Sequence, residues 1–120
     1  PVHKLVRLRL ANNQPLMLET AYLPAAIAPD LLSKDLSGSL YRVLTEEYGI
    51  PQREADQFIE PVLVREWEGN ILDVPAGRPA LMIETTVRGA DGRIVEFSRG
   101  IMHGNIARLY FHVSRSEGEP

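Results

Sequence analysis

Two strand-like segments joined by a short polar turn open the chain and constrain its fold more than any other feature. Residues 2–11 alternate side chains between two faces, as a half-buried strand requires, and residues 16–22 read as a second, returning strand. Between them lies Asn12-Asn13-Gln14-Pro15, in which Asn tolerates a positive φ and Pro fixes its own φ. We therefore expect a β-hairpin in an antiparallel sheet.

One face of this hairpin carries an unusual set of charges. Strand alternation places Arg7 and Arg9 on the same face as Leu5, and the returning strand brings in Glu19. The two guanidiniums could lie in solvent, with Glu19 as a weakly stabilising cross-strand partner. Alternatively they form an anion site, because adjacent arginines repel each other and Arg binds phosphate or carboxylate in a bidentate manner. The residues alone leave both interpretations open.

A second hairpin is predicted near the end of the chain. Residues 80–87 and 94–103 are rich in strand-forming residues and flank a turn of the Asp-Gly type at 90–93. Residues 1–19 and 79–96 also look like weak copies of each other, since each runs from a Pro through a strand and a polar corner to a Glu. The repeat would place Glu19 and Glu96 in related positions, where both could face one pocket.

The strongest helix signal lies between the hairpins. Residues 40–48 have apolar side chains at Leu40, Val43 and Leu44, with Ser39 as an N-terminal cap and Gly49 as a stop. A serine at a helix start also favours anion binding, because the first amides and the helix dipole attract negative charge. Ser39 is therefore either a plain cap or part of an anion site.

The remaining segments complete a mixed α/β (α+β) domain with an antiparallel sheet and a few packed helices. We expect a short helical turn over residues 30–35, an extended segment over 53–64 and a second helix over 66–72. The apolar face of that helix would carry Trp67, Ile71 and Leu72. We expect a last strand at 109–114, followed by a frayed polar tail.

Composition limits the functions open to the chain. Its 120 residues suit one domain, and a net charge of −3 argues against a general nucleic-acid surface. The absence of cysteine excludes thiolate chemistry and fits a cytoplasmic protein. The three histidines, His3, His103 and His112, lack metal-ligand spacing, so we expect no metal and no cofactor. No segment is apolar for long enough to suggest a membrane span.

Three segments, taken in order, resemble a known family. They are RLRLANNQPLMLETAYLP, DLSGSLYRVLTEEYGI and ILDVPAGRPALMIETTVRGADGRIVEFSRGIMHGN. This order resembles the UTRA effector-binding domain of GntR/HutC-type bacterial transcription regulators. The resemblance implies a chorismate-lyase-like fold over residues 1–120 and a winged helix-turn-helix DNA-binding domain upstream. It also implies that the first strand and helix of a typical domain precede Pro1, so the chain is expected to be a fragment.

The resemblance assigns roles to six residues. The two effector-binding arginines of the family correspond to Arg7 and Arg9, and its pocket carboxylates to Glu19 and Glu96. The serine and tyrosine of the SLY motif correspond to Ser39 and Tyr41. Met102 and Asn105 depart from the family pattern, which often has Tyr and Asp there, whereas the anion-binding half of the pattern is intact.

The resemblance therefore predicts a non-enzymatic sensor for a small anionic metabolite, such as a sugar phosphate or carboxylate. We expect a homodimer that contacts DNA only through the upstream domain, with the edge at residues 109–113 as a plausible interface. Two alternatives stay open: an enzyme of the chorismate-lyase type, and a dimerisation module without a ligand.

Overall fold

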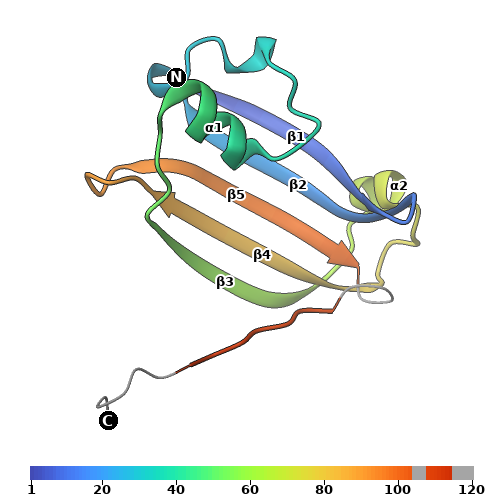
Figure 1. Cartoon of the computed structure of the whole chain (residues 1–120). Coiled ribbons are helices and arrows are strands. Elements are labelled where there is room, and N and C mark those ends of the chain that lie inside the picture. Colours follow the sequence, from blue (N-terminus) through green and yellow to red (C-terminus); the bar gives the residue numbers. More distant parts are fainter. Residues whose placement is uncertain (104–107, 115–120) are drawn as a thin grey trace.

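A computed structural model describes residues 1–103 and 108–114 of the chain. Its five strands form one antiparallel sheet in the order β1-β2-β5-β4-β3 (Figure 1). The predicted α+β class is thus confirmed. The elements are β1 (Val2–Ala11), β2 (Gln14–Pro24), the 3₁₀ turns η1 (Ala25–Ile27) and η2 (Leu31–Ser33), α1 (Leu40–Tyr48), β3 (Glu54–Leu63), α2 (Glu66–Leu72), β4 (Pro79–Arg88) and β5 (Ile94–His103).

The first hairpin is tighter than the sequence suggested. Its turn consists of Asn12 and Asn13 alone, both with positive φ (51° and 63°), and β2 begins at Gln14. A two-residue turn with both φ values positive matches the right-handed twist of the flanking strands, which explains why Asn is suited to both places. The pairing sets Arg7 directly opposite Glu19, so the cross-strand partnership considered from the sequence is realised.

Helix α1 covers one face of the sheet, which we call the front face. It forms at the predicted residues, where Ser39 Oγ accepts a hydrogen bond from the Arg42 amide and Gly49 adopts the left-handed conformation that ends the helix. Its buried residues Leu40 and Leu44 pack with residues from β1, β2 and the η1–η2 segment. The front core consists of Leu5, Ala21, Leu23, Ala28, Leu31, Leu40 and Leu44.

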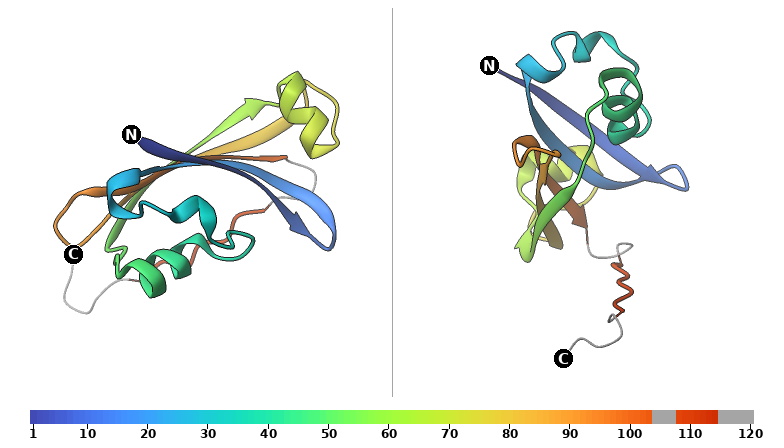
Figure 2. Two further views of the ribbon diagram at one scale, coloured as in Figure 1. Left: turned by 90° about the horizontal axis from the view of Figure 1, so that it is seen from above. Right: turned by 60° about the vertical axis from the view of Figure 1, so that its left-hand side comes forward.

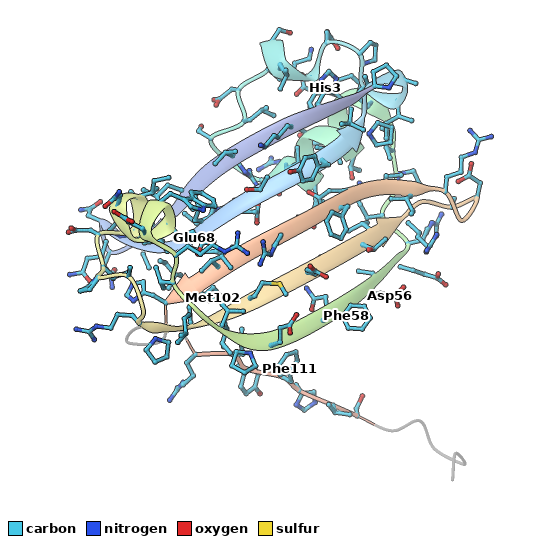
Figure 3. All side chains as sticks on the ribbon, turned by 180° about the vertical axis from the view of Figure 1, so that it is seen from behind. His3, Asp56, Phe58, Glu68, Met102 and Phe111 are labelled. Carbon is cyan, nitrogen blue, oxygen red and sulfur yellow. The ribbon has the colours of Figure 1, made fainter. Side chains whose placement is uncertain are left out.

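Helix α2 lies on the opposite, back face (Figures 1 and 2). It forms over the predicted residues, but the prediction of its apolar face was only partly right. Leu72 is buried, whereas the side chains of Trp67 and Ile71 are 50% and 41% exposed. The helix has only seven residues and touches the sheet near the ends of β2 and β4, so most of the back face stays open (Figure 3).

The predicted last strand was wrong. Residues 109–114 form no strand and extend away from the sheet (Figures 1 and 2), leaving Tyr110 84% exposed and Val113 87% exposed. Their side chains alternate as a strand would, but a strand also needs a hydrogen-bonded neighbour, and residues 109–114 pair with neither edge of the sheet. The extended segment at 53–64, in contrast, pairs with β4 and becomes β3, one edge of the sheet. Within the described residues, no helix has the length and apolarity needed to cross a membrane.

Candidate functional site

The six residues singled out from the sequence surround one cavity. It has a volume of about 400 Å³ and lies on the front face between the sheet and the N-terminal end of α1. Its size falls in the range of roughly 300–1,000 Å³ that is usual for small-molecule sites. Strands β1, β2 and β5 supply its floor and α1 its cover, so residues far apart in the chain meet there: Arg7, Arg9, Glu19, Ser39, Tyr41 and Glu96.

Arg7 is already engaged by the protein itself. Its Nη2 lies 2.5 Å from Glu19 Oε1, and its Nη1 donates to the Gly38 carbonyl at 3.0 Å and to the Leu36 carbonyl at 3.4 Å. Both partners of the ion pair are largely buried. Arg7 therefore ties the loop that precedes α1 to the hairpin, and Glu19 balances its charge.

Arg9 differs from Arg7 in that its charge stays available. It lies two residues along the same strand, is partly buried, and forms no hydrogen bond or ion pair within the described part of the chain. Ser39 stands across the cavity, where its hydroxyl caps α1 and its own proton remains free to be donated. The first amides of α1 lack intrahelical partners, which adds positive potential near Arg9. This end of the cavity is suited to one anionic group.

The other end of the cavity holds a buried carboxyl group. Glu96 is only 2% exposed, and Tyr41 donates its hydroxyl proton to Glu96 Oε1 over 2.7 Å. Burial raises the pKa of Glu96, and the negative charge of Glu19 adds to the rise, against the hydrogen bond from Tyr41, which lowers it. Burial and the neighbouring Glu96 also raise the pKa of Tyr41, so the phenol remains a donor. A ligand amine or hydroxyl group would find an acceptor here.

Several apolar residues of the cavity were missed by the sequence reasoning. Leu10, Leu16, Met17 and Leu40 line it beside the charged groups. Strict alternation puts Leu10 on the face opposite Arg9, but the register shifts between these two residues, and such a bulge re-aims the following side chain. The departure from alternation depends on strand pairing, which a single strand's pattern does not reveal.

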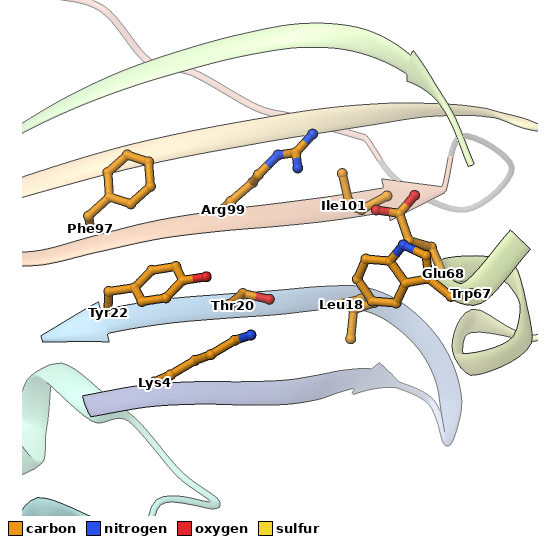
Figure 4. Close-up of a pocket in the computed structure, with 9 residues that line it drawn as sticks. All are labelled: Lys4, Leu18, Thr20, Tyr22, Trp67, Glu68, Phe97, Arg99 and Ile101. Carbon is orange, nitrogen blue, oxygen red and sulfur yellow. The ribbon is translucent and has the colours of Figure 1, made fainter. Parts of the chain in front are cut away.

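A second pocket, on the back face, contains none of the six residues. Figure 4 shows that β1, β2, β5 and α2 contribute to it, with Arg99 near the middle; its volume is about 280 Å³. Tyr22 and Phe97 stack at one end, with ring centroids 6.4 Å apart. Glu68 at the other end accepts a hydrogen bond from the Arg65 amide, so its carboxylate serves the start of α2. In the described residues, no group of three or more His, Cys, Asp or Glu side chains is placed to hold a metal ion.

The fold and the front cavity define the protein as an α+β domain in which one helix covers a small charged site on an antiparallel sheet. A comparison with known families identifies which such domain it is. Residues 1–108 match the UTRA domain, so the chain belongs to this family, whose members are effector-binding domains of GntR-type transcription regulators.

Named relatives and solved structures agree with this assignment. The chain is 31% identical to the HTH-type transcriptional repressor NagR of Bacillus subtilis, over 95% of this chain and 47% of the relative. It is 30% identical to the mannosyl-D-glycerate transport/metabolism system repressor MngR of Escherichia coli, over 78% and 39%. The effector domain of PhnF from Mycobacterium smegmatis has a similar structure, with a TM-score of 0.87 and 25% identity over 94% of this chain and 71% of that one. The chain thus spans less than half the length of these two curated relatives.

Proposed function

We propose that this domain binds a small anionic metabolite in the front cavity and thereby modulates DNA binding by another domain of the same regulator. The observation that carries the proposal is the asymmetry of the two arginines. Arg7 is neutralised by Glu19, whereas Arg9 points an uncompensated charge into the cavity beside the start of α1. A partly buried cation without a counterion favours binding of an anion.

The charge of the cavity points to a ligand with one anionic group, such as a carboxylate or a phosphate ester. Arg9 and Ser39 bind that group, and Glu96 accepts from a hydroxyl or amine on the same ligand. The name of MngR refers to mannosyl-D-glycerate, a compound that carries both a carboxylate and hydroxyl groups, and this supports the same class of ligand here.

The partners proposed for the whole regulator follow from its class. We infer a cytoplasmic homodimer that reads two DNA half-sites through a winged helix-turn-helix domain of the same regulator. Exposed apolar residues in the segment 109–113 support a contact with a second copy. In this proposal the six site residues either contact the ligand or hold the cavity in shape, and none is catalytic, which sets the proposal apart from a lyase of related fold.

Calorimetric titration of the domain with a panel of sugar phosphates, phosphonates and small carboxylates tests the proposal. Removing one arm of a partly desolvated charged contact costs about 2–5 kcal/mol, so Arg9→Ala should weaken the best ligand tens- to thousands-fold. Lys4→Ala is the matched control, because Lys4 is a cation of the same strand that faces the back pocket. Equal binding of a ligand by wild type and Arg9→Ala would mean that the ligand binds outside the front cavity. Conversion of chorismate to product by the domain would favour the alternative of a chorismate-lyase-type enzyme.

A further inference from the structure

A further cavity, distinct from the back-face pocket and smaller than the front cavity, adjoins the front cavity. It has a volume of about 290 Å³ and is lined mainly by polar residues of β3 and β4 and of the segment before β3. The register pairs Val87, which lines the smaller cavity, with Glu96, which lines the larger one, so the two cavities meet at this strand pair. Its lining residues are Tyr41, Gln52, Arg53, Glu54, Ala55, Gln57, Thr85 and Val87.

Among the residues that the structure describes, Tyr41 alone lines both cavities. It extends from the first turn of α1 and donates its hydroxyl proton to Glu96, so its side chain lies where the two cavities meet. The side chain is 41% exposed, and the hydrogen bond to Glu96 is its one polar contact within the described residues. Rotation of this side chain toward solvent is therefore opposed mainly by the loss of that bond.

We propose that Tyr41 is a partition that divides one elongated ligand site into two compartments. The inference rests on the proposed function: the anionic end of the ligand lies at Arg9, and the second compartment takes its far end. Because Gln57 Nε2 donates to Thr85 Oγ1 at 3.2 Å, and both groups keep unused hydrogen-bonding capacity, that end carries hydroxyl groups. The class of ligand is an extended monoanion, hydroxylated at the end away from its acid group.

The partition also makes the site selective. Breaking the bond between Tyr41 and Glu96 leaves a buried carboxyl group without its donor, which is costly unless the ligand replaces it. A ligand that brings a hydroxyl or amine to Glu96 displaces Tyr41, whereas one without such a donor stops at the ring. Tyr41 thereby sets both the length and the donor pattern of the ligand.

A length series measures the partition directly. Unbranched ω-hydroxy carboxylates of four to twelve carbons are titrated into wild type, Tyr41→Ala and Tyr41→Phe. Each methylene group buried adds about fourfold in affinity, so affinity rises with length until the chain meets Tyr41. In Tyr41→Ala the rise continues, so the ratio of the affinity of the longest acid to that of the shortest should be more than about tenfold larger than in wild type. Tyr41→Phe keeps the ring but lacks the hydrogen bond that holds it, so its affinities should rise beyond the wild-type limit, though by less than in Tyr41→Ala.

A second variant separates a partition from a general change in the fold. Gln57→Ala removes an exposed side chain of the second compartment, so it should weaken the longest acids in the Tyr41→Ala background and leave the shortest unchanged. An equal effect of Tyr41→Ala at all lengths, or no binding of any acid to either protein, overturns the partition. Binding that is insensitive to Arg9→Ala is a different result, because it overturns the proposed function itself.

Discussion

Arg7 and Arg9 have the same chemistry and lie two residues apart on one strand, yet their surroundings give them different tasks. Glu19 and two loop carbonyls hold Arg7 in place, whereas Arg9 lines the cavity without a hydrogen bond or ion pair to the described residues. The sequence indicates that both face the same side. It does not indicate which one is neutralised, because that depends on the strand register and on a loop almost thirty residues away.

Stability should distinguish the two arginines. Arg7→Ala leaves Glu19 partly buried without its counterion and frees two carbonyl groups, so we expect a loss of about 2 kcal/mol in unfolding free energy. Arg9→Ala removes no hydrogen bond or ion pair within the described residues and should change the unfolding free energy by no more than about 0.5 kcal/mol. Urea unfolding of the ligand-free domain measures both values. Equal losses would contradict the division of tasks.

Glu96 should make stability depend on pH. Burial raises the pKa of Glu96 in the folded state above its value in the unfolded state. At low pH the carboxyl group is protonated in both states, so burying it does not lower the free energy of unfolding. As pH rises, Glu96 ionises first in the unfolded state, which stabilises that state. The free energy of unfolding therefore falls until the pH has passed the pKa of Glu96 in the folded state. Glu96→Gln lacks this loss and still offers Tyr41 an acceptor. Its melting temperature should therefore match wild type near pH 4 and exceed it increasingly toward pH 8.

The exposed Glu46, which pairs with Arg42 on the surface of α1, provides a control for that experiment. Glu46→Gln should change the melting temperature little at any pH, since exposed pairs contribute only a fraction of a kcal/mol. A wild-type curve that runs parallel to Glu96→Gln from pH 4 to pH 8 would show that Glu96 ionises as readily in the folded as in the unfolded chain.

At the scale of elements, α1 combines two tasks at its N-terminus. Ser39 caps the helix, and the same helix end faces the cavity. Ser39→Ala should cost about 1 kcal/mol of unfolding free energy, while Ser39→Asp keeps a capping oxygen and should cost little. If the helix end also attracts the anionic ligand, Ser39→Asp should weaken binding far more than Ser39→Ala, because the new carboxylate repels it. Calorimetry beside urea unfolding separates capping from anion binding.

The elements that were predicted well have local causes, and the others do not. The caps of α1 and the two Asn residues of the first turn act over a few residues, so the sequence indicates them directly. The segment 109–114 has the alternation of a strand but no partner within the described chain. Trp67 and Ile71 have helical spacing, yet α2 is too short to cover them against the sheet. The pattern of a segment's side chains predicts its backbone conformation, whereas the burial of those side chains depends on which other element packs against them.

At the scale of the whole molecule, the exposed apolar residues predict self-association. Phe111 is 65% exposed and Val113 87% exposed, in a segment that extends beyond the sheet. We expect light scattering at tens of micromolar, a range set by ordinary interface affinities, to show a dimer. The double variant Phe111→Asp and Val113→Asp should shift it to monomer, whereas Ser114→Asp, a charge added in the same segment, should not. A wild-type monomer would argue against pairing through residues 109–113.

The ion pair between Arg7 and Glu19 has a consequence for the resting state of the sensor. In a site with two uncompensated arginines, the two positive charges would repel each other until an anion bound between them. Without an anion, such a site would tend to separate its arginines or to bind any abundant anion. Here Glu19 already neutralises one of the two arginines, so Arg7 and the loop before α1 are held in place without a bound anion. If an anionic effector binds at Arg9, as proposed, it meets a domain that is already folded, and we expect the response to be a small change around α1 rather than assembly of the domain.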